Sequence, residues 1–365
     1  KIFIFHLIKN LYRQGIRDFL ILTWYKNYEF KKLLPKKYKN SKIRIIKSKK
    51  KSGKISSLLN VKKYLNKELF VINGETYFDI NIRDLELLTL KNKSKIGIAL
   101  TKSKYHGGKL KYILNKNNTV NKIEIKKKKT DLVSGGIYYF KRDILKILPY
   151  SNSDIDYRLV YNVSKDYKIS AKYYKNNFID IGTIKNLKNV SIFLKNNTYK
   201  PCFFLDRDGV INQDLGYVYR KQDFLWKKNI FKAIKIINDN NHRVIIISNQ
   251  AGIGKGYYSE NDFNNLNKWM LNQFYKKGCF IDDVYYCPYH PDAIIKKFKK
   301  NSNLRKPKNG MILKALREWE IIKSKSILIG DQQSDILCGK KSNIKSYFVK
   351  NDIFKQIKSS VRKTS

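Results

Sequence analysis

Two aspartates stand two positions apart, directly after a short apolar stretch in the second half of the chain. Residues 203–205 read Phe-Phe-Leu, and Asp206 and Asp208 follow them. An apolar run of this length indicates a buried strand, and ligands of open α/β sheets bind beyond the carboxyl ends of strands. A carboxylate there can attack phosphorus, transfer a proton or hold a divalent cation. An ordinary turn could carry the same residues, so the motif alone leaves both interpretations open.

Three further groups of polar residues stand at the ends of expected elements. Hydroxyl and amide groups can hold phosphate oxygens, basic side chains supply fixed positive charge, and carboxylates suit Mg²⁺. The groups are Ser248, Asn249 and Gln250 after a strand at 244–247, Arg305 and Lys306 before a helix, and Asp331 and Asp335 after a strand at 326–329. Because parallel strands bring their carboxyl ends to one edge of a sheet, we expect these groups to meet the aspartate pair.

This order and spacing resembles the haloacid dehalogenase superfamily of phosphotransferases. Within it, residues 201–350 resemble the D-glycero-D-manno-heptose 1,7-bisphosphate 7-phosphatases. The resemblance rests on residues 206–212, 216–218, 248–253, 285–288 and 305–307. The histidinol-phosphate phosphatases share much of this pattern, but the Gly-Tyr-Val stretch at 216–218 and the Ala-Gly-Ile turn at 251–253 favour the heptose branch.

The resemblance implies phosphoryl transfer through a covalent intermediate. Asp206 would be the nucleophile that forms an aspartyl-phosphate. Asp208 would protonate the departing sugar oxygen and then activate the water that cleaves the intermediate. Mg²⁺ would be held by Asp206, Asp331 and a backbone carbonyl near Asp208, so that two anions can approach each other. Asp335 would support this site rather than bind the metal.

The same resemblance assigns the other polar residues to the substrate. Ser248, Asn249 and Lys306 would bind the transferring phosphoryl oxygens, with Gln250 beside them. Arg305 would contact the second phosphate or the hydroxyls of the substrate, or else form a structural salt bridge. We therefore expect a Mg²⁺-dependent phosphatase that removes the 7-phosphate of the heptose bisphosphate in nucleotide-heptose and surface-polysaccharide biosynthesis. A phosphatase for histidinol phosphate or another small sugar phosphate is the alternative.

The resemblance also raises the question of a structural zinc site, which we expect to be absent. The heptose phosphatases usually hold Zn²⁺ with three cysteines and one histidine, and such a closed site needs four donors. Here Cys287 keeps one ligand position, whereas Tyr289, Ser302 and Leu304 stand at the other three. Even if His290 turned inward, half of the site would lack ligands. Cys287 is therefore predicted to be a small buried apolar residue.

The first half of the chain resembles the sugar-1-phosphate nucleotidyltransferases, particularly the branch that makes GDP-heptose from heptose 1-phosphate. The resemblance rests on residues 70–79, 134–140 and 178–183. It implies that Glu75 and Asp180 bind a catalytic metal and that Gly135 and Gly136 lie against the sugar phosphate. Glu75 replaces the usual Asp, and the family's Gly-rich loop would precede Lys1. We expect the fold to be kept and a nucleoside triphosphate to be the possible second substrate.

The elements that must position these residues read as α/β throughout. Strand-length apolar runs alternate with amphipathic helical stretches, which is typical of mainly parallel sheets. Helices are predicted over 3–14, 229–240 and 259–277, and strands over 19–23, 42–47, 69–73, 95–101, 202–205, 243–247 and 326–329. The expected architecture is two Rossmann-like domains, a nucleotidyltransferase-like sheet and a haloacid-dehalogenase-like parallel sheet with a minimal cap.

Length and composition fit this architecture and bound the function. A chain of 365 residues favours two domains, which we place at 1–197 and 201–352, joined by a polar linker at 195–200 and followed by a flexible tail at 353–365. A net charge of +48 suggests a polyanion-binding protein. However, only 12 of the 77 basic residues are Arg, and no nucleic-acid motif is present, so a solvated Lys-rich surface is favoured. Four scattered cysteines and no long apolar run predict a cytoplasmic protein without a membrane partner.

Overall fold

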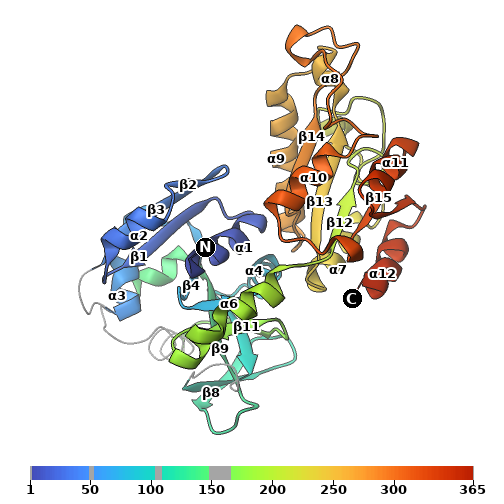
Figure 1. The fold of residues 1–365 in the computed structure, drawn as a ribbon. Helices are drawn as coiled ribbons and strands as arrows, with labels where there is room; N and C mark the ends of the chain where they lie inside the picture. The colour runs from blue at the N-terminus through green and yellow to red at the C-terminus, as the bar shows by residue number, and fades with distance from the viewer. Residues whose placement is uncertain (1, 49–52, 103–108, 148–165, 365) are drawn as a thin grey trace. The chain divides into compact units, whose positions relative to one another are not determined.

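The computed structural model describes residues 2–48, 53–102, 109–147 and 166–364, and the chain divides into two compact units (Figure 1). Unit 1 covers Lys1–Phe193 and unit 2 covers Leu194–Ser365. The boundary falls within helix α6 (Ile184–Thr198), so the stretch expected to be a polar linker is helical up to Thr198. In the part of the chain that the structure describes, no helix has the length and apolar character needed to cross a bilayer.

Unit 2 is built on one five-stranded parallel sheet. Its strands lie in the order β14-β13-β12-β15-β16, with β12 at the centre. Their bounds are β12 Cys202–Leu205, β13 Arg243–Asn249, β14 Asp283–Cys287, β15 Ile327–Gly330 and β16 Lys345–Phe348. All four residues of β12 are buried, which requires cover on both faces of the sheet and explains why its sequence does not alternate with polar residues.

Helices supply this cover (Figure 1). One core cluster joins the inward side chains of β12, β13 and β15 to those of α7, α9 and α12, while α10 and α11 contact the strands β13 to β16. The helices are α7 Ile230–Asp239, α8 Ala251–Gly254, α9 Glu260–Lys276, α10 Gly310–Glu318, α11 Gln333–Lys341 and α12 Ile353–Thr364, with short 3₁₀ turns η5 Lys221–Asp223, η6 Lys296–Phe298 and η7 Lys323–Lys325. Helix α9 begins with a capping box between Ser259 and Asp262.

The expectation of a flexible tail at 353–365 is wrong, because this segment forms α12. Ile353, Ile357 and Val361 follow one another at intervals of four residues and are buried in the core cluster. At the end of the helix, Thr364 Oγ1 lies 2.9 Å from Nε2 of the buried His242. An apolar stripe and an anchored last turn hold the helix against α7.

The described residues of unit 1 form two larger sheets and two small antiparallel pairs. A three-stranded sheet has the order β1-β3-β2, and a four-stranded sheet the order β10-β6-β9-β4; β5 pairs with β11 and β7 with β8. The strands are β1 Asp18–Thr23, β2 Lys37–Tyr38, β3 Ser41–Lys47, β4 Glu68–Ile72, β5 Thr76–Phe78, β6 Ile96–Lys102, β7 Leu110–Leu114, β8 Val120–Ile125, β9 Leu132–Lys141, β10 Ile169–Tyr173 and β11 Phe178–Asp180. The helical segments are α1 Phe3–Arg13, α2 Asn27–Leu33, α3 Gly53–Asn60, α4 Ile82–Lys91, and the turns η1 Lys62–Tyr64 and η3 Arg142–Lys146.

The predicted strands and helices agree with the structure to within a few residues, and the α/β class is confirmed. The expectation of mainly parallel sheets holds in unit 2 only. In unit 1, the long strand β9 runs antiparallel to both of its neighbours, β6 and β4. Strand direction depends on how the chain returns to the sheet, which a local apolar pattern does not record.

Candidate active site

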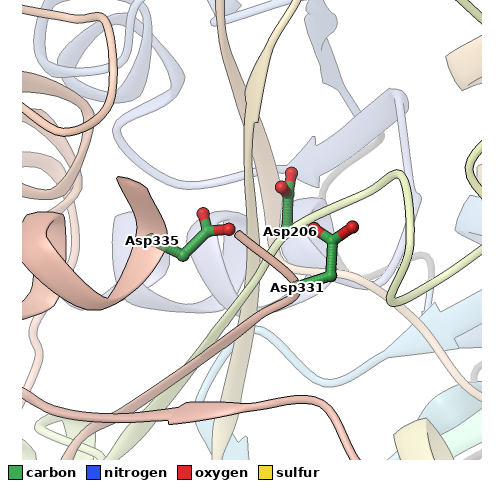
Figure 2. A group of neighbouring side chains, drawn as sticks. All are labelled: Asp206, Asp331 and Asp335. Atoms are coloured by element: carbon green, nitrogen blue, oxygen red, sulfur yellow. The ribbon is translucent and has the colours of Figure 1, made fainter. Parts of the chain in front are cut away.

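Three aspartates meet at the carboxyl edge of the unit 2 sheet and form what we call the aspartate cluster: Asp206, Asp331 and Asp335. Leu205 of β12 is paired with Ile329 of β15, so the residues that follow these two strands emerge side by side. Asp335 comes from the first turn of α11. One carboxylate oxygen from each residue lies within 4.8 Å of the others (Figure 2). The sequence predicted the meeting of Asp206 and Asp331 from their places at strand ends.

Gly209 makes room for the close approach of Asp331. Its φ is +79°, a conformation that side chains rarely adopt. A Cβ atom on Gly209 would lie 2.2 Å from Oδ2 of Asp331. Only glycine therefore allows the loop after β12 to turn back while a carboxylate from the neighbouring strand lies against it.

Lys306 joins two members of the aspartate cluster. Its ammonium is almost completely buried, 2.7 Å from Oδ2 of Asp206 and 2.6 Å from Oδ1 of Asp335. It also donates to the carbonyl oxygen of Ile247 at 3.2 Å. Burial disfavours the charged form, but the attraction of the two carboxylates outweighs burial and raises the pKa of Lys306. The ammonium is thus a permanent positive charge beside Asp206.

The electrostatics of the aspartate cluster favour a cation. Burial raises the pKa of Asp206 to about 7, against the opposing effect of Lys306, and nearby Asp335 and Asp208 raise it further. Burial also raises the pKa of Asp331. One ammonium does not balance three closely spaced carboxylates, and hard oxygen donors are the ligands that Mg²⁺ prefers. The donor set therefore fits Mg²⁺, and Asp206, Asp331 and Asp335 are the side chains that could hold it, two of which also contact Lys306.

The carboxylate of Asp208 lies outside the aspartate cluster and is held separately. Arg207 approaches both of its oxygens, with Nη2 to Oδ2 at 2.8 Å. Asn212 donates to Oδ1 at 2.9 Å and Gln250 to Oδ2 at 3.1 Å. A fifth of the side chain remains exposed. If Asp208 contacts a metal, its backbone carbonyl is therefore the group that could do so, because its carboxylate is engaged by Arg207, Asn212 and Gln250.

The residues at the end of β13 are brought to the site as predicted, but their side chains are largely engaged with protein groups. The Asn249 amide exchanges two hydrogen bonds with the backbone of Lys306, at 3.0 and 3.1 Å. Gln250 donates to the hydroxyl of Ser248 at 2.7 Å, and this hydroxyl keeps its own proton for another acceptor. Asn249 thus fixes the backbone of Lys306, and Ser248 is the side chain of this group that could still donate to a phosphoryl oxygen.

Arg305 carries positive charge next to this site. Its buried Nη1 has no hydrogen-bond partner among the residues that the structure describes. Burial lowers the pKa of His290, and the nearby charges of Arg305 and Lys255 lower it further. Lys255 itself donates to the hydroxyl of Tyr217 at 2.9 Å. Lys255 was missed in the sequence, although it directly follows the Ala-Gly-Ile turn and its glycine.

The predicted residues of unit 1 are brought to two neighbouring strands, but they are paired with other protein groups. Glu75 lies 3.3 Å from the ammonium of Lys54. The carboxylate of Asp180 accepts from the backbone N–H of Gly182 at 2.7 Å and from Thr76 Oγ1 at 3.3 Å. In the described ranges, neither carboxylate belongs to a group of three or more metal-ligating side chains.

Gly135 and Gly136 lie in β9 and are required by packing. A Cβ on Gly135 would lie 2.5 Å from the Phe78 ring, and one on Gly136 would lie 2.7 Å from the Asn73 amide. The contact with a sugar phosphate expected for these glycines stays a prediction.

The loop after β14 is held by aromatic and backbone contacts. Cys287 is fully buried, and burial raises the pKa of its thiol. The Tyr289 ring lies 5.9 Å from that of Phe298, and the Lys300 ammonium lies 3.9 Å from the centre of the Tyr289 ring. These contacts support the prediction that Cys287 is a packing residue.

Comparisons with known proteins assign both units. The model of the family "Nucleotidyl transferase" matches residues 1–197, more than half of the chain, and the model "Haloacid dehalogenase-like hydrolase" matches residues 292–349. The chain belongs to the nucleotidyl transferases through unit 1 and to the haloacid dehalogenase-like hydrolases through unit 2. The two families suggested by the sequence are thereby confirmed, and unit 2 is related to phosphatases.

Three relatives of this chain are named as heptose bisphosphate 7-phosphatases, two for the alpha and one for the beta form of the sugar. A "D-glycero-alpha-D-manno-heptose-1,7-bisphosphate 7-phosphatase" of Burkholderia mallei is 44% identical over 39% of this chain and 76% of its own length. A protein of the same name from Photorhabdus laumondii is 41% identical over 43% of this chain and 85% of its own length. The "beta" counterpart of Rhodopseudomonas palustris is 37% identical over 40% of this chain and 82% of its own length.

Proposed function

We propose that unit 2 is a Mg²⁺-dependent phosphatase that removes the 7-phosphate of D-glycero-D-manno-heptose 1,7-bisphosphate. The observation that carries this proposal is the aspartate cluster with Lys306, three carboxylates and one buried ammonium at one sheet edge, which are the groups that this reaction needs. The names of relatives that are 37% to 44% identical support the substrate.

In the first step, a carboxylate oxygen of Asp206 attacks the phosphorus of the 7-phosphate. The bond between phosphorus and the sugar oxygen breaks, and Asp208 gives its proton to that oxygen. Lys306 is positioned to hold Asp206 and to offset charge on the phosphoryl oxygens. A bound Mg²⁺ supplies further charge neutralisation between the two anions. The products of this step are heptose 1-phosphate and the aspartyl-phosphate.

In the second step, water attacks the aspartyl-phosphate and inorganic phosphate leaves. Asp208, now ionised, takes the proton from the attacking water, which restores both aspartates to their starting states. Its partly exposed carboxylate edge allows access for this water. The Asp208 carboxylate therefore acts as the acid in the first step and as the base in the second.

Arg305 supports a bisphosphate as the substrate. Its buried Nη1 lacks a protein acceptor among the described residues, and Lys255 adds positive charge close by. A guanidinium in this state is suited to a second phosphate, which histidinol phosphate does not have. We therefore favour the heptose substrate over the alternative.

Unit 1 is proposed to act on the product of unit 2. Loss of the 7-phosphate leaves heptose 1-phosphate, and a nucleotidyl transferase joins a sugar 1-phosphate to a nucleotide, with release of pyrophosphate. The family of unit 1 supports this pairing. The four cysteines are buried free thiols, which supports a reducing, cytoplasmic location for both reactions.

The test is a comparison of phosphate release from both anomers of the heptose bisphosphate and from histidinol phosphate, each with Mg²⁺. We expect kcat/KM for one heptose anomer to exceed that for histidinol phosphate by about 100-fold or more, the loss that follows when a site built for a polar group meets a substrate without it. Equal values for the bisphosphate and histidinol phosphate would refute the assignment. An Asp206→Asn variant serves as the control for contaminating phosphatases.

A further inference from the structure

Gln250 has all its polar groups committed to protein partners. Its Nε2 donates to Oδ2 of Asp208 at 3.1 Å and to Oγ of Ser248 at 2.7 Å. Its Oε1 accepts from the hydroxyl of Tyr258 at 2.6 Å. The side chain is only 2% exposed. A residue in this position has no free group for a phosphate oxygen, which is the role that the sequence suggested for it.

Tyr258 determines which way the Gln250 amide faces. A hydroxyl that donates to Oε1 forces the NH₂ group toward Asp208 and Ser248. Burial raises the pKa of Tyr258, so its hydroxyl keeps its proton and remains a donor. Without this donor, rotation of the amide by half a turn would direct Oε1 toward Asp208, where it would accept the proton that this carboxyl must give to the sugar oxygen.

The surroundings of Tyr258 are shaped to hold its ring in place. A Cβ on Gly252 would lie 2.3 Å from the ring, so only glycine fits there. The Tyr219 ring stacks on that of Tyr258, with a centroid distance of 5.0 Å and an interplanar angle of 9°. These packing contacts hold the Tyr258 side chain, and therefore its hydroxyl, in one position.

We propose that Tyr258 and Gln250 are positioning residues that act through Asp208. Gln250 links Asp208, which moves the proton, to Ser248, which faces the phosphoryl group, and Tyr258 fixes the direction of that link. Arg207 and Asn212 hold the carboxylate from the other side. The carboxylate is thereby aimed with its open edge toward the leaving oxygen. This inference rests on the proposed phosphatase function of unit 2.

The test uses two substrates that differ in their need for an acid. The heptose bisphosphate has an alkoxide leaving group that must be protonated, whereas p-nitrophenyl phosphate has a stable phenolate leaving group. The parameter kcat/KM reports events up to the first irreversible step, so it excludes hydrolysis of the aspartyl-phosphate. The variant is Tyr258→Phe in the full chain, and the matched control is Tyr219→Phe, whose ring packs on Tyr258 but whose hydroxyl is outside this hydrogen-bond chain.

For Tyr258→Phe, we expect kcat/KM for the heptose bisphosphate to fall about tenfold or more, part of the roughly 10²–10⁴-fold that a positioned acid contributes. The value for p-nitrophenyl phosphate should change by less than about threefold, because its phenolate leaves without protonation by an acid. Gln250→Met, which keeps the volume and removes the polar atoms, should show the same dependence on the leaving group. Tyr219→Phe should resemble the wild type on both substrates.

Equal losses on the two substrates would show that Tyr258 has only a structural role, and wild-type values on both would show that it has no role; either result overturns the inference. If Tyr258→Phe does not fold, Gln250→Met decides by the same criterion. Failure of the wild-type chain to hydrolyse the heptose bisphosphate would instead refute the proposed function, so the two failures are distinguishable.

Discussion

Acidification from pH 8 to pH 6 should weaken Mg²⁺ binding to unit 2 by about tenfold, because Asp206 gains a proton over this range. Burial raises the pKa of this carboxyl to about 7. A single group with that pKa is about 90% ionised at pH 8 and about 10% ionised at pH 6. Mg²⁺ binds the ionised form, so its apparent affinity follows the ionised fraction. The raised pKa of Asp331 has the same sign and can only increase the effect.

The raised pKa of Asp206 also makes the folding stability of the metal-free protein depend on pH. The pKa of Asp206 is higher in the folded protein than in the unfolded chain, so its contribution to stability is complete below about pH 4 and is lost as the pH rises through about 7. Bound Mg²⁺ favours the ionised form and reverses this loss. The increase in Tm on addition of Mg²⁺ should therefore be larger at pH 8 than at pH 6.

Calorimetric titration of the full chain with MgCl₂ at pH 6, 7 and 8 measures the Kd for Mg²⁺ at each pH. Repeated in buffers of different ionisation enthalpy, it also measures the number of protons released when Mg²⁺ binds. Asp206→Asn is the control, since its amide does not titrate; its residual binding should be weak and should depend on pH less than that of the wild type, through Asp331 alone. Mg²⁺ affinity that is the same for the wild type at pH 6 and pH 8 would refute the argument that a buried, protonatable Asp206 is a ligand.

Three other outcomes are expected. Asp206→Asn should abolish phosphate release with the fold intact, as checked by circular dichroism. Asp208→Asn should also fail, with any residual activity strongest on substrates with good leaving groups; wild-type turnover by the Asp206 variant would contradict the mechanism. Elemental analysis should find well under one zinc per chain and chelators should leave the Tm unchanged, because Cys287 is one donor where four are needed; stoichiometric, tightly held zinc would overturn this. Asp180→Asn should leave kcat/KM for phosphate release within about twofold of the wild type, since each unit has its own core; a larger loss would show that the units are coupled.

Much of the unit 2 site could be predicted because its residues follow strands. Asp206 and Asp331 stand directly after apolar runs that had to be buried, and parallel pairing of β12 with β15 brings them together. The amphipathic spacing of Ile353, Ile357 and Val361 was equally visible, and it should have predicted α12 in place of a flexible tail. The segment was expected to be flexible because it lies at the end of the chain, although its sequence has the spacing of an amphipathic helix.

The hydrogen-bond partners could not be predicted from spacing. Arg207 turns back to pair with its own neighbour, Asp208, and its burial depends on the cover provided by the loop at Val218 and by the Phe263 ring. Whether Gln250 binds a phosphate or a protein group depends on where the hydroxyl of Tyr258 lies, and tertiary packing alone decides this.

In unit 1, the ion pair of Glu75 with Lys54 joins residues that are separated by most of helix α3, the turn η1 and the strand β4. Nothing in the local sequence of either residue indicates the other. Side-chain chemistry identifies what a residue can do, and the fold decides which partner it has.

The central claim is that unit 2 removes the 7-phosphate and leaves the 1-phosphate. The most direct measurement follows the phosphorus NMR spectrum of the heptose 1,7-bisphosphate during incubation with the full chain and Mg²⁺. We predict that the signal of the phosphate on C7 disappears as inorganic phosphate forms, that the signal of the phosphate on C1 persists, and that Asp206→Asn leaves both unchanged. Loss of the C1 phosphate first, or an unchanged spectrum with the wild type, would contradict the account.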